Sequence, residues 1–299
     1  MRTAYNVRFH VMLRRTAIAA LVGGSRMAAH RMVQLGRYLG EADGTALLLD
    51  CRTRRLIAAA RSDLACQWLA PPGSTLKPFS LSALMETGKV AAEEQFLCPG
   101  QLEIAGKSFA CSHPPMGVAM RVSTAIAYSC NCFVAHFAQR FEPGALARYL
   151  ERAGLTSRTG LLGDDEVVGE VQSAESTDAR QLQALGEQRV LVTALEMVVA
   201  YHRLASRASH PEMASILEGL EGAVEYGTAQ HAGVPGIKVA GKTGTVRTST
   251  GGHAAWFTGF AASRAPAVVV TVLVHGRSGG ADAAPIAGRI LKAHRAGLL

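Results

Sequence analysis

Two polar residue types are scarce in this chain of 299 residues. It has only two asparagines, Asn6 and Asn131, and six lysines against twenty-five arginines. Arginine stays protonated at any working pH, so of these two residue types only lysine can act as a base. The position of each lysine and asparagine is therefore informative.

Acidic residues and lysines are both absent from residues 1–40, which carry seven arginines. The formal net charge is +8, so subtracting these seven charges leaves +1 for residues 41–299. Nucleic-acid grooves need clustered basic side chains, usually interleaved with aromatic ones, and no such stripe occurs here. We expect no nucleic-acid partner.

The basic segment contains one apolar run, residues 16–24, directly after Arg14-Arg15. It suits the hydrophobic region of a signal peptide and is too short for a bilayer span, which needs about twenty residues. We interpret residues 1–40 as a basic leader. It is a signal peptide, an uncleaved anchor that gives N-terminal membrane association, or a disordered extension.

The remaining chain has the composition of a globular domain, with 48% hydrophobic and 18% charged residues overall. Residues 45–61 predict a hairpin of two strands, and residues 237–245, 254–262 and 267–275 predict three more. Residues 284–296 predict a closing helix. Residues 41–299 are expected to form one domain.

The stretch from Pro71 to Phe79 predicts a turn that runs into a helix, because Pro71-Pro72-Gly73 interrupts any preceding element. We expect Ser74 at the helix start and Lys77 beside it, since residues three apart on a helix are neighbours. A serine hydroxyl becomes nucleophilic when an adjacent base takes its proton, and a buried lysine is such a base. Without further motifs, a capping serine and a solvated lysine would explain this spacing better.

Two further motifs follow in a fixed order: Ser129-Cys130-Asn131, and Lys242-Thr243-Gly244-Thr245. The first motif contains one of the two asparagines, and Lys77 and Lys242 are two of the six lysines. The set S-x-x-K, S-x-N and K-T-G is shared by penicillin-binding proteins and serine β-lactamases. From about Gly40 to its C-terminus, the sequence resembles the transpeptidase domain of penicillin-binding proteins.

This resemblance implies an α/β (α+β) fold with a central antiparallel sheet of about five strands. Helices pack on the sheet, a helical lobe lies beside it, and the active site lies between the two. It implies a peptidoglycan D,D-transpeptidase or D,D-carboxypeptidase outside the cytoplasm, acting on stem peptides that end in D-Ala-D-Ala. β-Lactams would be inhibitors, and no cofactor is expected.

The resemblance also assigns roles to the motif residues. Ser74 attacks the penultimate D-alanine carbonyl while Lys77 takes its proton, and Ser129 relays a proton to the departing D-alanine. The amide of Asn131 holds the substrate backbone, Lys242 supplies positive charge, and the backbone N–H groups of Ser74 and Thr245 form the oxyanion hole. The remaining substrate-binding residues are Thr243, Gly244 and Thr245.

The six cysteines leave their pairing open. Cys98 and Cys111 bracket a short segment with a turn at Gly106-Lys107, and in an exported protein they could form a disulfide or remain buried thiols. We interpret Cys130 and Cys132 as packing residues. We expect no metal, because no second Cys/His cluster has ligand spacing. His113 is a weaker candidate for a catalytic base.

Two alternatives remain. One is a serine β-lactamase or β-lactam sensor, although the E-x-x-L-N segment that supplies the deacylating carboxylate of class A β-lactamases is absent from the sequence. The other is a non-catalytic scaffold in a cell-wall synthesis complex. Residues 1–40 leave no room for a glycosyltransferase or pedestal domain, so we expect a transpeptidase domain that depends on other cell-wall synthesis proteins for localisation.

Overall fold

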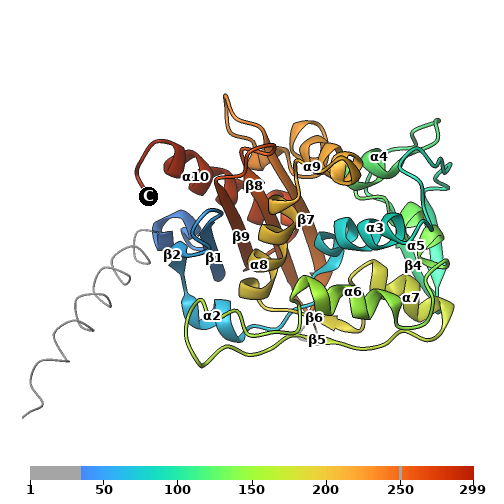
Figure 1. Cartoon of the computed structure of the whole chain (residues 1–299), viewed down its shortest axis with the longest axis horizontal. Coiled ribbons are helices and arrows are strands. Elements are labelled where there is room, and N and C mark those ends of the chain that lie inside the picture. The colour runs from blue at the N-terminus through green and yellow to red at the C-terminus, as the bar shows by residue number, and fades with distance from the viewer. Residues whose placement is uncertain (1–34, 249–250) are drawn as a thin grey trace, which may run out of the picture.

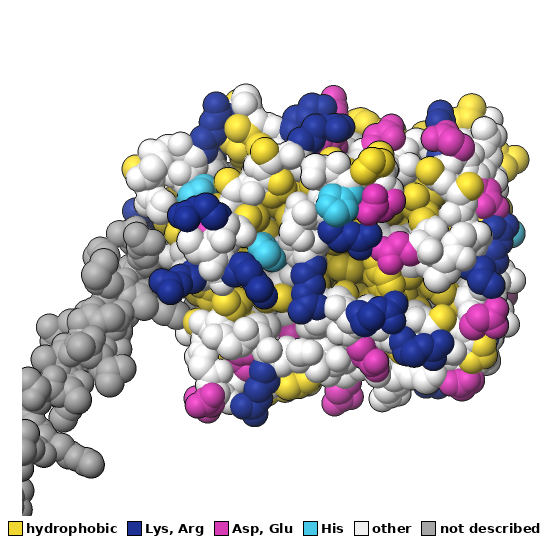
Figure 2. Space-filling model, viewed as in Figure 1, with side chains coloured by type: hydrophobic (Ala, Val, Ile, Leu, Met, Phe, Trp, Pro, Cys, Tyr) yellow, Lys and Arg dark blue, Asp and Glu magenta, His cyan; other side chains and the backbone are white. Residues whose placement is uncertain are grey.

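The computed structural model describes residues 35–248 and 251–299. Most of the predicted leader, residues 1–34, lies outside the described residues. Within the described ranges, no helix has both the length and the apolar character that a membrane crossing requires. On the face shown in Figure 2, basic and acidic side chains both occur, in keeping with the near balance of charge after residue 40.

A five-stranded antiparallel sheet forms the centre of the molecule, in the strand order β2-β1-β9-β8-β7 (Figure 1). The predicted hairpin forms β1 (Gly44–Asp50) and β2 (Leu56–Ala60). The three predicted C-terminal strands form β7 (Val239–Arg247), β8 (His253–Ala261) and β9 (Val268–His275). The expected fold class is confirmed, and β7 lies at an edge of the sheet.

Helices cover both faces of this sheet. Leu47 and Leu49 face a core that includes α8 (Ala194–Ser206), and Leu48 points to the opposite face, toward α10 (Ala284–Arg295). This alternation follows from the two-residue period of a strand. The valine-rich β9 is buried on both faces because a helix packs on each side of it.

A helical lobe lies beside the β7 edge, on the right in Figure 1. It contains α3 (Lys77–Glu86), α4 (Val122–Ala127), α5 (Asn131–Ala138), α6 (Ala145–Ala153) and α7 (Thr177–Ala184), with the hairpin β3 (Gln101–Ile104) and β4 (Lys107–Ala110). Helix α9 (Ala214–Glu225) contacts both α4 and β7 and so joins the lobe to the sheet. The smaller elements are α2 (Ser62–Gln67), β5 (Glu170–Val171) and β6 (Val190–Leu191).

The predicted start of the helix at Ser74 is wrong by three residues. A 3₁₀ turn, Gly73–Leu76, comes first, and the α-helix begins at Lys77. Pro78 explains this boundary, because proline has no N–H and its fixed φ suits the first turn of an α-helix. Ser74 therefore lies in the tight turn before α3, not at its cap.

The acidic stretch that begins at Asp164 has the composition of an exposed loop, but it is not wholly exposed. The Glu166 side chain is buried, and it accepts backbone N–H bonds from Thr159, Gly160 and Leu162. Burial alone would raise the pKa of Glu166, but these hydrogen bonds outweigh it and lower the pKa. One carboxylate thus organises the turn at residues 159–162.

We predict that Glu166→Ala lowers the free energy of unfolding by about 2–3 kcal/mol, because it leaves several backbone N–H groups without an acceptor. Urea denaturation measures the change. The matched control is Glu170→Ala at an exposed position, which we expect to stay within about 0.5 kcal/mol of wild type. Equal losses in the two variants would contradict the role given to Glu166.

Candidate active site

A pocket of about 510 Å³ lies where the β7 edge meets the helical lobe. All three sequence motifs contribute to its wall through Ser74, Ser129, Asn131 and residues 243–245. The other lining residues are Ala110, Ser112, His113, Pro114, Tyr128, Tyr226, Gly227, Thr228, Ser278 and Gly280. The motifs are far apart in sequence, so only the tertiary fold brings them to one cavity.

The turn that carries Ser74 is fixed from several sides. Gly73 has φ +52°, a left-handed conformation that favours glycine, and its N–H donates to the carbonyl of Gly186 at 3.0 Å. The buried Tyr201 hydroxyl donates to the Thr75 carbonyl at 2.8 Å, and Trp256 Nε1 donates to the Pro71 carbonyl at 2.9 Å. Trp256 is also a fully buried core residue, and no local sequence pattern indicates its bond to this turn.

Lys77 connects the first motif to the second. Its Nζ is fully buried and donates to the Ser129 carbonyl at 2.7 Å, to Ser129 Oγ at 3.3 Å and to Asn131 Oδ1 at 2.6 Å. These three bonds use all the donors of an ammonium group. Lys77 therefore holds the second motif in place and lies within proton-transfer distance of Ser129 Oγ.

The Ser129-Cys130-Asn131 motif leads from α4 into the first residue of α5. Ser129 has φ +57°, which is uncommon for a residue other than glycine and involves strain. Asn131 begins α5, and its Nδ2 donates to the Ala110 carbonyl at 2.8 Å. The bonds to Lys77 and Ala110 stabilise the strained turn and direct the Ser129 side chain to the pocket.

The third motif lies on the outer strand β7, whose free edge faces the pocket. Lys242 is fully buried, and its Nζ donates to the Thr243 carbonyl at 3.1 Å. A side-chain carbon on Gly244 would lie 2.7 Å from the Pro72 carbonyl oxygen, so this position requires glycine. Gly244 therefore marks a close approach between β7 and the turn that carries Ser74.

Both threonines of this strand are hydrogen-bonded within the protein. Thr243 Oγ1 donates to Thr228 Oγ1 at 2.8 Å, and Thr245 Oγ1 accepts from the Gly279 N–H at 3.0 Å. The pocket also has hydroxyl side chains that belong to none of the three motifs: Tyr128, Tyr226, Thr228 and Ser278. Tyr226 and Thr228 belong to the turn that follows α9.

Burial dominates the electrostatics of the two lysines. It lowers the pKa of Lys77 to about 8, against the opposite effect of the Cys130 and Cys111 sulfurs and of Glu187. Burial also lowers the pKa of Lys242 well below its usual value, and the charge of Lys77 adds to this effect. Lys77 is thus able to gain and lose a proton near neutral pH, which an arginine at this position could not do.

The family comparison agrees with this geometry. The penicillin-binding protein transpeptidase domain model matches residues 44–292. The chain belongs to this family. Its transpeptidase domain therefore covers most of the sequence, as the three motifs predicted.

Relatives of this transpeptidase domain are distant. It is 26% identical over 266 residues to the stage V sporulation protein D of Bacillus subtilis, covering 74% of this chain and 41% of that protein. It is 27% identical over 274 residues to the peptidoglycan D,D-transpeptidase PbpA of Mycobacterium tuberculosis, covering 75% and 54%. The chain thus spans about half the length of these curated relatives.

Solved structures share the transpeptidase fold. PBP2 of Pseudomonas aeruginosa, in complex with WCK 5153, has a TM-score of 0.78 at 19% identity over 90% of this chain and 77% of that one. A peptidoglycan glycosyltransferase of Burkholderia ambifaria has a TM-score of 0.78 at 20% identity over 91% and 95%. At these identities the likeness establishes the fold alone.

Sequence spacing left the pairing of Cys98 and Cys111 in this transpeptidase domain open. All six are free thiols in the structure, and Cys98 Sγ lies 3.7 Å from Cys111 Sγ. Cys130 and Cys132 lie equally close to Cys111. The structure therefore does not single out the Cys98–Cys111 bond. Cys130 and Cys132 are buried, as packing residues are, and both also contact Cys111.

We predict that Tyr201→Phe lowers the free energy of unfolding by about 1–2 kcal/mol, because it leaves the buried Thr75 carbonyl without its donor. Chemical denaturation measures the loss. Tyr226→Phe, at a half-exposed hydroxyl, is the control and should stay close to wild type. No loss in Tyr201→Phe would show that the bond does not stabilise the turn.

Proposed function

We propose that this protein is a peptidoglycan D,D-transpeptidase that works through an acyl-serine intermediate outside the cytoplasm. The observation that carries the proposal is the convergence of Ser74, Ser129 and the free β7 edge on one pocket, with Lys77 buried behind them. Its substrates would be stem peptides ending in D-Ala-D-Ala, and its partners other proteins of cell-wall synthesis.

In the proposed reaction the donor peptide lies along β7 as an added strand, since an edge strand offers unpaired backbone groups. Neutral Lys77 takes the proton of Ser74 Oγ, which attacks the penultimate D-alanine carbonyl. The backbone N–H groups of Ser74 and Thr245 stabilise the oxyanion. The hydroxyls of Thr243 and Thr245 hold the terminal carboxylate.

Collapse of the tetrahedral intermediate breaks the peptide bond and releases D-alanine. Ser129, hydrogen-bonded to Lys77, returns the proton to the departing amine. The amine of a second stem peptide then attacks the acyl-serine ester, restores the serine hydroxyl and forms the cross-link. Division of one acyl transfer into two easier steps is the benefit of covalent catalysis.

A β-lactamase needs rapid attack of water on its acyl-serine. An acyl-enzyme that is stable to water can instead pass its acyl group to an acceptor amine. Among the described residues that line the pocket, none is aspartate or glutamate. Activation of a deacylating water by a carboxylate therefore has no candidate in this wall. This supports the transpeptidase over the alternative of a serine β-lactamase.

The test is labelling with a fluorescent penicillin, followed over hours. We expect a stable label on wild type, no label on Ser74→Ala, and normal labelling of Ser206→Ala, a serine outside the pocket. Rapid loss of label from wild type would favour the β-lactamase. No label on folded wild type would leave only the non-catalytic scaffold.

Acceptor dependence separates transpeptidase from carboxypeptidase. We expect D-alanine release from a D-Ala-D-Ala stem pentapeptide to rise when an amine acceptor is added, with the amide as product by mass spectrometry. Release that is unchanged by acceptor, with only the hydrolysed peptide formed, would make the protein a carboxypeptidase.

The acylation rate should increase with pH. Lys77 acts in its neutral form and its pKa is about 8, so the neutral fraction rises about fivefold between pH 7 and pH 8 and levels off above pH 9. Stopped-flow acylation measures this profile. Lys77→Arg cannot supply the base and should acylate at a small fraction of the wild-type rate at every pH. A flat wild-type profile over this range would contradict Lys77 as the base.

A further inference from the structure

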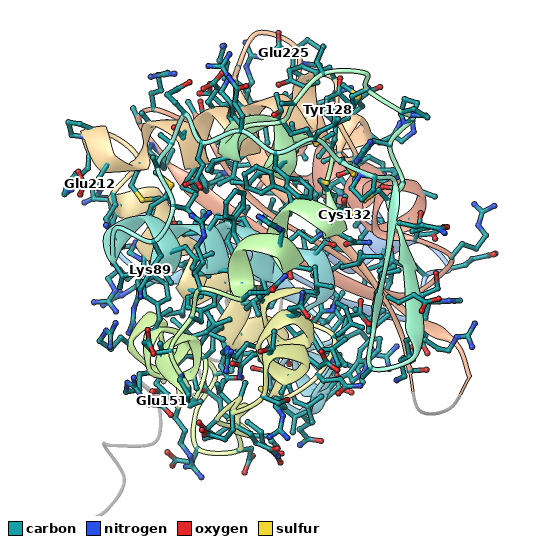
Figure 3. The ribbon with its side chains drawn as sticks, turned by 90° about the vertical axis from the view of Figure 1, so that its right-hand side faces the viewer. Lys89, Tyr128, Cys132, Glu151, Glu212 and Glu225 are labelled. Atoms are coloured by element: carbon teal, nitrogen blue, oxygen red, sulfur yellow. The ribbon has the colours of Figure 1, made fainter. Side chains whose placement is uncertain are left out.

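Four of the six cysteines converge beside the pocket. Cys111 Sγ lies 3.7 Å from Cys98 Sγ, 3.8 Å from Cys130 Sγ and 3.5 Å from Cys132 Sγ, and the Sγ atoms of Cys130 and Cys98 are 3.4 Å apart. In Figure 3, Cys132 and Tyr128 lie on the same side of the molecule, near the hairpin β3–β4. The other two cysteines, Cys51 and Cys66, belong to the sheet side of the fold.

These separations match a metal–thiolate centre. Zinc holds thiolates at about 2.3 Å in a tetrahedron, which places neighbouring sulfurs about 3.8 Å apart. A disulfide joins only two sulfurs, at about 2 Å. Cys111, in contact with three other sulfurs, has more close neighbours than one disulfide uses. Outside the cytoplasm, oxidising conditions would convert such a cluster to disulfides unless a bound metal protected the thiols.

His113 supplies a nitrogen at the same place. Its ligand atom and the sulfurs of Cys98, Cys111 and Cys130 all lie within 4.8 Å of one another. Nδ1 lies 2.8 Å from the Pro114 carbonyl and so acts as its donor, whereas Nε2 is buried and has no hydrogen-bond partner. A donor bond from one ring nitrogen with the other left free is the usual arrangement of a metal-binding histidine.

Backbone groups support two of the sulfurs. The Gly100 N–H donates to Cys98 Sγ and the Phe133 N–H donates to Cys130 Sγ, each at 3.3 Å. Such bonds stabilise negative charge on a thiolate and orient metal ligands. They arise from the turn after Cys98 and from the first turn of α5, so the fold itself presents these sulfurs.

We propose that Cys98, Cys111, Cys130 and His113 bind one zinc ion, with Cys132 beside the site as a neighbour of Cys111. On binding, the three thiols release their protons to solvent and bond to the metal as thiolates, while neutral His113 binds through Nε2. The ion therefore joins the β3–β4 segment to the Ser129-Cys130-Asn131 turn.

The position of the ion gives it a structural role at the active site. Ala110, Ser112 and His113 line the pocket, and Asn131 already bonds to the Ala110 carbonyl. Zinc bound to Cys111 and Cys130 would hold this wall against the second motif. This inference does not depend on the proposed reaction, because the ligands hold the metal whether or not Ser74 is acylated.

The experiment is a zinc titration of the reduced full chain against a chromogenic chelator, with cobalt(II) substitution as a second readout. We expect one equivalent of zinc and the absorption of a tetrahedral cobalt–thiolate site. Cys98→Ser and His113→Ala should each lower zinc affinity more than about 100-fold, since even loss of an outer contact typically costs 10–100-fold. Cys66→Ser, outside the cluster, should bind like wild type.

Substoichiometric zinc and no cobalt spectrum on folded, reduced wild type would overturn the proposal, and this result needs no variant to fold. Binding retained in His113→Ala but lost in Cys132→Ser would replace the histidine with a fourth cysteine and overturn the ligand set. Penicillin labelling is measured separately. A protein that labels but binds no zinc refutes only the metal site, and one that binds zinc without labelling refutes only the proposed function.

Discussion

The geometry of the candidate active site depends on the hydrogen bonds of the buried Lys77 ammonium group. Removing a lysine from water is costly unless its donors are satisfied, and here the second motif supplies all three acceptors. The same bonds hold Ser129 in a left-handed conformation that it would not otherwise favour. One hydrogen-bond network, which links the first motif to the second, therefore sets the position and protonation of Lys77 and the strained backbone of Ser129.

The third motif meets this network through backbone packing. Gly244 allows β7 to approach the turn before α3, and the sheet fixes that turn again through Trp256 and the Pro71 carbonyl. Tyr201 reaches the same turn from α8, across the core. Ser74 thus belongs to a segment held by the sheet, by a core helix and by the edge strand, which is the rigidity that a preorganised site requires.

A metal bound by the cysteine cluster would likewise make rigid the pocket wall formed by Ala110, Ser112 and His113. The segment from Cys98 to Pro114 has only the short hairpin β3–β4 as regular structure, and most of the hairpin's residues are exposed or half-buried. A cross-link at Cys111, Cys130 and His113 would secure the part of the pocket that has the least core beneath it. Cys130 lies between Ser129 and Asn131 in sequence, so any ligand of that sulfur acts directly on the second motif.

The sequence by itself determined the sheet, the order of its strands along the chain and the three motifs that contain Ser74, Lys77 and the other candidate site residues, because strand periodicity and short motifs are local signals. It placed the helix start three residues early and treated Glu166 as exposed, since capping and burial depend on segments that arrive from elsewhere. Only the tertiary structure decided the partners of Lys77, the hydroxyls of Thr228 and Ser278 in the pocket, and the convergence of four cysteines with His113. Those contacts join residues distant along the chain, and no local pattern records which distant residues a fold brings together.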